Sequence, residues 1–258
     1  MKFFKTILIV LFSIVYVPLS YAVMGLGGIL FVLMRLVGVS HGFAHKTSAG
    51  LAMKVCLYMT LSKVRVIYDP NYDPQRRSMY AQNHVSMIDG HVACASIPHE
   101  FCGLMNAWHF HIPCYGWIMR CTGGIPVFPH KAGRTAEVTA AAQDRIQRGL
   151  SILVYPEGHR TVDMQVAKFK RGVFFMARDA NIPVVPMAVH GIHQVNRKGK
   201  YTFTPGEVTV YVGAQIETTG LTDDDVNALA ERTRDIVSAF ADTGVVPIPM
   251  DKKEILAA

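Results

Sequence analysis

A histidine and an aspartate five residues apart, His84 and Asp89, form the pair in this sequence that is best suited to catalysis. On one continuous helix they would be rotated by about 500° (140° net) and would lie on different faces. They can meet only if His84 lies in a loop and Asp89 in the first turns of the following helix. The carboxylate would then bond to one imidazole nitrogen and leave the other free as a base. The alternative is that Asn83 or Ser86 caps the helix and His84 is a bystander.

Two polar segments further along the chain have side chains that suit contacts with a hydroxyl or a phosphate. The first is Tyr155–Arg160 (YPEGHR), which reads as a polar turn after a strand. The second is Lys168–Gly172 (KFKRG), which is expected to open a helix. Taken alone, this basic cluster is more typical of a solvated or membrane-facing surface than of a phosphate site.

The sequence lacks the motifs that are typical of several other enzyme and metal-site classes. The histidines lack the H-x-H-x-D-H order of binuclear metallohydrolases, so we expect no metal. The 5 cysteines include no C-x-x-C, which favours a reducing compartment over a disulfide framework. G-x-S-x-G and Walker motifs are absent, and Gly25-x-Gly27 lies within an apolar segment.

The composition points to an anionic and apolar environment. Half of the chain is hydrophobic, 17% is charged and the mean hydropathy is +0.24, which excludes a disordered or acidic tail-like protein. The net charge of +7 favours an anionic partner. The apolar N-terminal segment fits an anionic membrane better than nucleic acid.

From residue 63 onward, short β-rich runs alternate with helical stretches. This alternation predicts an α/β fold with a single mixed, largely parallel sheet flanked by helices. The expected strands are Val64–Tyr68, Ser78–Gln82, Glu100–Leu104, Gly124–Phe128, Ser151–Tyr155, Pro183–Val189 and Val208–Val212. The expected helices cover residues 87–96, 106–121, 134–148, 168–180 and 222–240. Functional side chains are expected at the carboxyl edge of the sheet, where strands end and helices begin.

The N-terminal segment is a candidate membrane anchor. Residues 6–34 carry no charged side chain, and as one helix they would be roughly 43 Å long, against a hydrocarbon core of about 30 Å. Pro18 and the Gly25–Gly28 run divide the stretch, which leaves both a long tilted span and a re-entrant hairpin open. Cations on both flanks mildly favour the hairpin. A cleavable signal peptide and a buried core helix are the alternatives.

Four motifs in order resemble the glycerolipid acyltransferase family, with the greatest likeness to the bacterial 1-acyl-sn-glycerol-3-phosphate acyltransferases. They are N-H-x-S-x-x-D from Asn83, G-x-P-V-F from Gly124, P-E-G-x-R from Pro156, and F-K-x-G followed by V-x-P-x-x-V from Phe169. The resemblance runs from Val64 to Val212, and the order of the motifs makes it far more specific than any one of them. It favours a catalytic His84 over the capping alternative.

The resemblance implies acyl transfer from acyl-CoA or acyl carrier protein to the free hydroxyl of a lysophospholipid, above all 1-acylglycerol-3-phosphate, without a cofactor. His84 would be the general base, and Asp89 would orient it and stabilise its charged form. The residues expected to bind substrate are Glu157, Gly158, Arg160, Lys170, His130, Arg134 and Ser86.

The sequence departs from the family pattern at three positions. The arginine that commonly follows the second motif is His130, the usual threonine of the third motif is His159, and the usual phenylalanine before it is Tyr155. These changes leave the acyl-transfer residues matched and leave the acceptor headgroup open, with a lyso-ornithine lipid as one alternative. An acyl-thioester hydrolase and a non-catalytic membrane-binding protein are further alternatives.

The expected organisation is an anchor or hairpin over residues 1–39, a helical connector over 40–62, an acyltransferase domain over 63–244 and a tail over 245–258. The resemblance implies a bacterial inner membrane with the domain on its cytoplasmic face. The expected partners are anionic phospholipid, the lysophospholipid acceptor and the acyl donor, and not nucleic acid.

Overall fold

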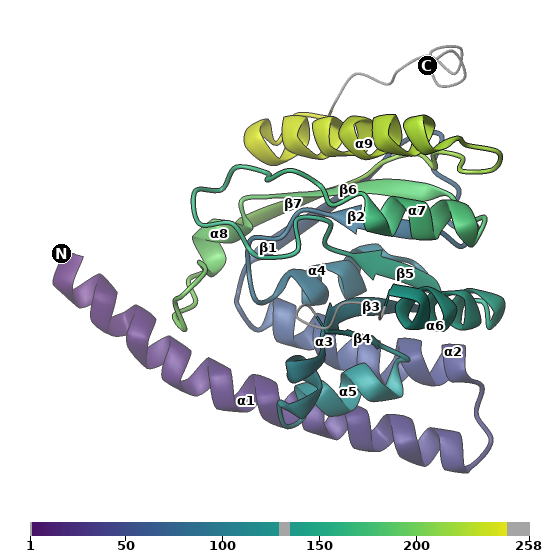
Figure 1. Ribbon diagram of the computed structural model, residues 1–258. Coiled ribbons are helices and arrows are strands. Elements are labelled where there is room, and N and C mark those ends of the chain that lie inside the picture. The colour runs from purple at the N-terminus through teal and green to yellow at the C-terminus, as the bar shows by residue number, and fades with distance from the viewer. Residues whose placement is uncertain (1, 129–134, 247–258) are drawn as a thin grey trace.

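The computed structural model describes residues 2–128 and 135–246. Its centre is a 7-stranded sheet in the order β1-β7-β6-β2-β5-β3-β4 (Figure 1). Among the described strand pairs, β6–β7 is antiparallel and the others are parallel. The strands are β1 (Lys63–Tyr68), β2 (Met79–Gln82), β3 (Phe101–Asn106), β4 (Ile125–Val127), β5 (Ser151–Val154), β6 (Val184–His190) and β7 (Glu207–Val212). The predicted mixed, largely parallel sheet is confirmed.

Helices cover both faces of the sheet, because side chains alternate along each strand. On β2, Met79 and Ala81 belong to one buried cluster and Tyr80 belongs to another. The first face is covered by α6 (Thr135–Gln147), α7 (Gly172–Asp179) and α9 (Asp223–Thr243). The second face is covered by α1 (Lys2–Leu36), α3 (Gly50–Tyr58), α4 (Asp89–Ser96) and the short α8 (Ile192–Val195). Figure 1 shows α9 and α1 on opposite sides of the molecule.

The predicted helices are present, with two differences. The helix expected over 106–121 is divided into the 3-10 helix η2 (Ala107–His111) and α5 (Tyr115–Cys121), because Pro113 and Cys114, which has a φ of 60°, interrupt it. The helix expected over 168–180 begins only at Gly172. The N–H of Lys170 donates instead to the carbonyl of Pro156 at 2.9 Å, which holds the preceding segment against the third motif.

The expected helical connector folds into three short pieces. They are α2 (His41–Ala44), the π-helical turn η1 (His45–Ala49) and α3. Figure 1 shows that these pieces run back along α1, so that α1 and the connector together form a helical layer at the base of the molecule.

The N-terminal segment is one continuous helix of 35 residues with Pro18 inside it, so the mild preference for a hairpin within residues 6–34 is wrong. The glycines that suggested a turn have a packing role. A Cβ at Gly27 would lie 2.5 Å from Cβ of Ala52, and one at Gly25 would lie 3.0 Å from Sγ of Cys114. Glycine destabilises a helix by about 1 kcal/mol relative to alanine, and here it allows α3 and α5 to approach α1 closely.

Helix α1 is long and apolar enough to cross a membrane, judged by length and composition. One side of it, including Tyr16, Met24 and Phe31, is buried against the domain. Its other side is exposed, and only 22% of its most apolar window is buried, which does not fit a core helix of a soluble protein. The helix therefore presents an apolar surface that the described residues do not cover, and this weakly indicates membrane association.

Candidate active site

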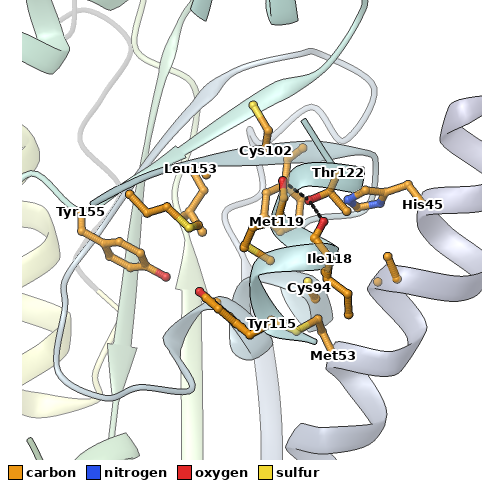
Figure 2. A pocket seen from close by; sticks show the side chains of 16 residues that line it. His45, Met53, Cys94, Cys102, Tyr115, Ile118, Met119, Thr122, Leu153 and Tyr155 are labelled. Atoms are coloured by element: carbon orange, nitrogen blue, oxygen red, sulfur yellow. Dashed lines mark hydrogen bonds between the residues drawn. The ribbon is translucent and has the colours of Figure 1, made fainter. Parts of the chain in front are cut away.

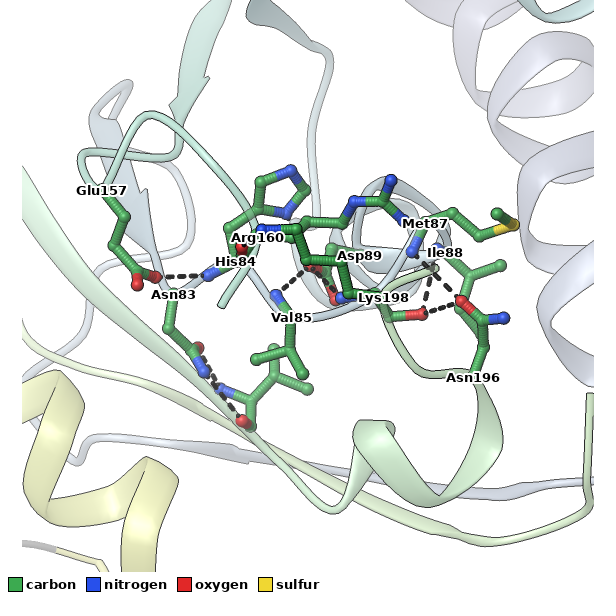
Figure 3. A network of polar contacts seen from close by, with 12 residues as sticks. Asn83, His84, Val85, Met87, Ile88, Asp89, Glu157, Arg160, Asn196 and Lys198 are labelled. Atoms are coloured by element: carbon green, nitrogen blue, oxygen red, sulfur yellow. Dashed lines mark hydrogen bonds and ion pairs between the residues drawn. The ribbon is translucent and has the colours of Figure 1, made fainter. Parts of the chain in front are cut away.

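The loop between β2 and α4 brings His84 and Asp89 together as the five-residue spacing requires. Nδ1 of His84 lies 2.7 Å from Oδ2 of Asp89, and the acceptor is a carboxylate, so Nδ1 is the donor. The same oxygen accepts hydrogen bonds from the backbone N–H groups of Val85 and Ser86 at 2.8 and 2.9 Å (Figure 3). Asp89 is 1% exposed. The carboxylate thus fixes both the imidazole tautomer and the path of the loop.

The free face of the His84 imidazole is available for a reacting group. Its side chain is 23% exposed, and none of the described residues bonds to Nε2. The ring stacks on Tyr155, with centroids 4.0 Å apart and planes inclined by 18°. The departure from the family at position 155 therefore places a partly buried tyrosine directly behind the candidate base.

Glu157 holds the backbone of the candidate base. Its Oε1 accepts from the N–H of His84 at 2.6 Å, and its Oε2 accepts from the N–H of Ala167 at 2.9 Å. Burial raises the pKa of Glu157, while these two hydrogen bonds act in the opposite direction. Because both oxygens accept backbone bonds and the residue is 3% exposed, the structure gives Glu157 a positioning role, and the predicted contact with substrate is not among its described contacts.

Asn83 serves the loop in a way that differs from helix capping, whereas Ser86 also accepts from the N–H of Ile88 at 3.3 Å, just before α4. The side chain of Asn83 donates to the carbonyl of Val189 at 3.1 Å and accepts from its N–H at 2.8 Å, which ties the end of β2 to β6. The hydroxyl of Ser86 donates to Oδ1 of Asn196 at 3.0 Å. Ser86 is fully buried and positions the loop, and its predicted role in substrate binding stays a prediction. The helix-capping alternative for Asn83 is wrong.

The remaining residues of the third and fourth motifs lie together beside this loop. Gly158 has a φ of 77°, a conformation that favours glycine. The ammonium of Lys170 lies so close to Gly158 that a Cβ there would clash with it. Nη1 of Arg160 is buried and has no partner among the described residues. A buried guanidinium nitrogen without an acceptor is a natural place for an anionic group of a substrate.

Two predicted binding residues, His130 and Arg134, lie outside the described residues. Among the described residues, no group of three or more His, Cys, Asp and Glu side chains could hold a metal ion. His91 is buried, and that burial lowers its pKa to about 4, which fits a neutral core residue.

Asn196 is a functional residue that sequence reasoning missed. Its Oδ1 accepts from Ser86 and from the N–H of Met87, and its Nδ2 donates to the carbonyls of Lys200 and Thr202 at 2.9 and 3.2 Å. Figure 3 shows Asn196 on one side of the loop, with Glu157 and Asn83 on the other. More than 100 residues separate it from Ser86, and no local spacing signals the contact.

An apolar pocket lies behind Tyr155, between the sheet and the helical layer (Figure 2). It is partly open to solvent. Its lining is His45, Ala49, Gly50, Met53, Gly90, Cys94, Phe101, Cys102, Gly103, Met105, Tyr115, Ile118, Met119, Thr122, Leu153 and Tyr155. Burial lowers the pKa of His45 to about 4, so its imidazole is uncharged at neutral pH. The pocket is therefore apolar and neutral, and Tyr155 separates it from His84 by a single ring.

Comparison with known proteins agrees with this arrangement. Residues 63–190 match the family model described as "Acyltransferase". The chain belongs to the acyltransferase family. It is 30% identical over 154 residues to a 1-acyl-sn-glycerol-3-phosphate acyltransferase of Chlamydomonas reinhardtii, a match that covers 58% of this chain and 46% of the relative. It is 29% identical over 157 residues to the human 1-acyl-sn-glycerol-3-phosphate acyltransferase beta, covering 60% and 56%.

The matched region thus spans about half the length of these acyltransferase relatives. A solved structure has the same fold over almost the whole chain. The 1-acyl-sn-glycerophosphate acyltransferase from Thermotoga maritima superposes with a TM-score of 0.76 at 20% identity, covering 97% of this chain and 100% of that one. At this identity the likeness shows the fold, including the helical layer that precedes the sheet.

Proposed function

We propose that this acyltransferase moves an acyl chain from acyl-CoA or acyl carrier protein to the free hydroxyl of 1-acylglycerol-3-phosphate and so forms phosphatidic acid. Family membership and the names of the relatives support the reaction class. The observation that carries the proposal is the 2.7 Å bond between His84 and Asp89 beside a neutral apolar pocket. A base that adjoins a hydrophobic pocket suits a substrate with a long apolar chain.

In the proposed reaction, Nε2 of His84 takes the proton of the acceptor hydroxyl as its oxygen attacks the thioester carbonyl. Asp89 stabilises the imidazolium that forms, through its bond to Nδ1. The tetrahedral intermediate then expels the thiolate, which takes the proton back from His84. The enzyme returns to its starting state, and no cofactor or covalent enzyme intermediate is needed because the thioester is already activated.

The apolar pocket is the proposed place for the donor acyl chain. Its wall includes Gly90, which follows Asp89 directly, and Tyr155, which stacks on His84. If an acyl chain occupied this pocket, its carbonyl end would lie next to His84. Each methylene that leaves water contributes about 0.8 kcal/mol, so the pocket would hold the thioester carbonyl within reach of His84.

For the acceptor, the proposal uses the cations beside the loop. Arg160 has a buried nitrogen without a partner among the described residues, and Lys170 lies against Gly158. Glu157 acts on the acceptor only through the backbone of His84. His130 and Arg134 remain proposed acceptor contacts.

Membrane attachment is proposed through the helical layer. Helix α1 packs along the domain from Ser13 to Phe31, so a perpendicular span would draw the domain into the bilayer, and we propose that α1 lies in the interface plane instead. Exposed side chains of this layer include Phe4, Leu11, Leu26, Leu33, Leu51 and Tyr58. Trp108 of η2 and Trp117 of α5, a helix that packs on α1, are exposed as well. Tryptophan and tyrosine are typical of the membrane–water interface. The cysteines are free, which supports the cytoplasmic face of a bacterial inner membrane.

An acceptor screen tests the proposed function. Protein in detergent micelles would receive palmitoyl-CoA with lysophosphatidic acid, with lyso-ornithine lipid, with a neutral lysophospholipid, or with no acceptor. We expect CoA release that depends on lysophosphatidic acid and is lost in the folded His84→Ala variant. Release at the same rate without an acceptor would replace the proposal with a hydrolase. Preference for another headgroup would move the substrate assignment, and full activity in His84→Ala would remove the mechanism.

A further inference from the structure

A second cavity, which we call the cationic cavity, adjoins the His84–Asp89 loop. It is partly open to solvent and is lined by Val85, Thr161, Val162, Met164, His193, Arg197 and Lys198. We propose that the cationic cavity binds the phosphate monoester of the acyl acceptor, a role that rests on the proposed function and assigns His193, Arg197 and Lys198 to recognition of the headgroup.

The cationic cavity shares its walls with the catalytic loop. Val85 follows His84 directly and donates its N–H to Asp89. The N–H of Thr161 donates to the carbonyl of His84 at 2.9 Å. The ammonium of Lys198 donates to the carbonyl of Arg160. Two lining residues of this cavity, Val85 and Thr161, therefore adjoin His84 directly, one through the chain and one through a hydrogen bond. An anion in the cavity would lie close to the candidate base.

Residues 196–200, which include Arg197 and Lys198, are held in place by hydrogen bonds in the absence of a ligand. Asn196, which is 1% exposed, directly precedes Arg197 and bonds to Ser86 and Met87 of the catalytic loop. On its other side the amide bonds to the carbonyl of Lys200, and the N–H of Lys200 closes a turn onto the carbonyl of Arg197 at 3.1 Å. Preorganisation of this kind reduces the entropy lost on binding.

The charge of the cationic cavity suits a phosphate monoester. Arg197 and Lys198 contribute two permanent positive charges, and His193 adds an imidazole whose pKa is lowered by burial, by Arg197 and by His190. The nearby Asp163 does not line the cavity, and its Oδ1 accepts from the N–H of Gln165 at 3.2 Å. A doubly charged phosphate gains from two adjacent cations, whereas a zwitterionic headgroup gains less.

The position of the cationic cavity favours the lipid acceptor over the phosphates of the donor. The segment that follows it rests on α1, where the N–H of Phe203 donates to the hydroxyl of Ser13 at 2.8 Å. The rings of Phe203 and Tyr16 lie 4.4 Å apart. At the mouth, Val162 and Met164 are 77% and 44% exposed. Cations flanked by exposed apolar side chains next to the proposed membrane helix fit a lipid headgroup that enters from the bilayer.

Kinetics of Arg197→Gln and Lys198→Gln would test the assignment, with Lys63→Gln as the control because that side chain is 86% exposed on β1. In full-length protein in micelles, we expect each cavity variant to raise the KM for lysophosphatidic acid at least tenfold, since the loss of one charged hydrogen bond costs about 1.4 kcal/mol or more, the free energy to which tenfold corresponds. The KM for palmitoyl-CoA and the behaviour of Lys63→Gln should stay unchanged. An unchanged KM for lysophosphatidic acid, or a rise only in that for palmitoyl-CoA, would overturn the proposal.

A binding measurement separates this proposal from the proposed function. The melting temperature of each protein would be followed with sn-glycerol 3-phosphate and, in a second arm, with adenosine 3′,5′-bisphosphate, which carries the phosphates of CoA. We expect sn-glycerol 3-phosphate to stabilise the wild type and not Arg197→Gln, even if no lyso-lipid is acylated. Equal stabilisation of both proteins would refute the cationic cavity while leaving the acyl transfer intact. Stabilisation by the bisphosphate alone would assign the cavity to the donor and contradict us.

Discussion

The apolar pocket and the cationic cavity lie beside the same short loop and differ in almost every physical property. The apolar pocket is enclosed by the sheet and the helical layer, and its one imidazole, that of His45, is neutral at pH 7. The cationic cavity lies at the surface and is lined by Arg197 and Lys198. With His84 as the proposed base, this pair of regions suits a reaction that joins an apolar chain to an anionic headgroup.

This difference separates the regions that would select the acyl chain from those that would select the headgroup. In the proposed enzyme, the apolar pocket selects the acyl chain by volume, whereas the cationic cavity selects the headgroup by charge. His84 and Asp89 belong to neither lining. Substitutions in the two regions should therefore have separable effects, and those in the loop should affect every substrate equally.

The largest expected effect comes from Asp89→Asn, which would remove the charge that stabilises the imidazolium and orients His84. We expect kcat to fall by about 10²–10⁴ for every acyl chain and every acceptor. The measurement is CoA release with lysophosphatidic acid, with circular dichroism to establish that the variant folds. A folded variant that loses activity with only one class of substrate would assign Asp89 to that substrate's region.

Glu157 holds the backbone of the loop that lies beside both regions. In Glu157→Gln one amide N–H₂ must face a backbone N–H of His84 or Ala167, which leaves donors opposed and costs about 1–3 kcal/mol. We expect a clear fall in the melting temperature together with a lower kcat for all substrates. The matched control is Glu207→Gln, whose side chain is 78% exposed. Equal melting temperatures for the two variants would show that the Glu157 clamp contributes little.

Chain selectivity should respond to Gly103→Val, which adds an isopropyl group to the wall of the apolar pocket. The new Cβ would lie 3.2 Å from the flexible end of Met105, so the strand can accommodate it. Exclusion of about two methylenes, at about 0.8 kcal/mol each, corresponds to about tenfold in kcat/KM for palmitoyl-CoA. Octanoyl-CoA serves as the internal control and should be used as before. Equal loss for both donors would argue that the pocket does not hold the chain.

The smallest expected effect concerns the free energy of unfolding of the protein at acidic pH, through His45 in the apolar pocket. Burial lowers the folded-state pKa of His45 to about 4 from an ordinary value of 6.5. Between these pH values the unfolded chain binds a proton that the folded chain does not, so stability falls as the pH falls, by at most about 1.4 kcal/mol per pH unit. His45→Leu should flatten this dependence in urea unfolding at pH 7, 5.5 and 4.5, whereas the exposed-residue control His111→Leu should not. The same steep slope in both variants would refute a neutral buried His45.

The sequence predicted what is local. The spacing of His84 and Asp89 required a loop followed by a helix. Both are present: His84 lies in the loop after the buried strand β2, and Asp89 begins α4. Contacts between distant residues could not be read in this way. The bond between Ser86 and Asn196 and the stacking of His84 on Tyr155 depend on the order of strands in the sheet.

The N-terminal segment shows a different limit. Glycines in an apolar run are compatible with a turn and with close helix packing, and the sequence alone does not distinguish these. The position of Ala52 against Gly27 decides for packing. The same holds for Glu157. Its acidic side chain suggests a substrate contact, whereas in the structure it accepts hydrogen bonds from two backbone N–H groups.

The most direct test of the central claim is a double-mutant cycle on His84 and Asp89. Acyl transfer from palmitoyl-CoA to lysophosphatidic acid would be measured for wild type, His84→Ala, Asp89→Asn and the double variant. If the two side chains act as one base, the double variant should have the kcat of His84→Ala alone, because Asp89 acts only through the imidazole. A double variant slower than His84→Ala by the full factor lost in Asp89→Asn would show independent roles and contradict the proposed mechanism.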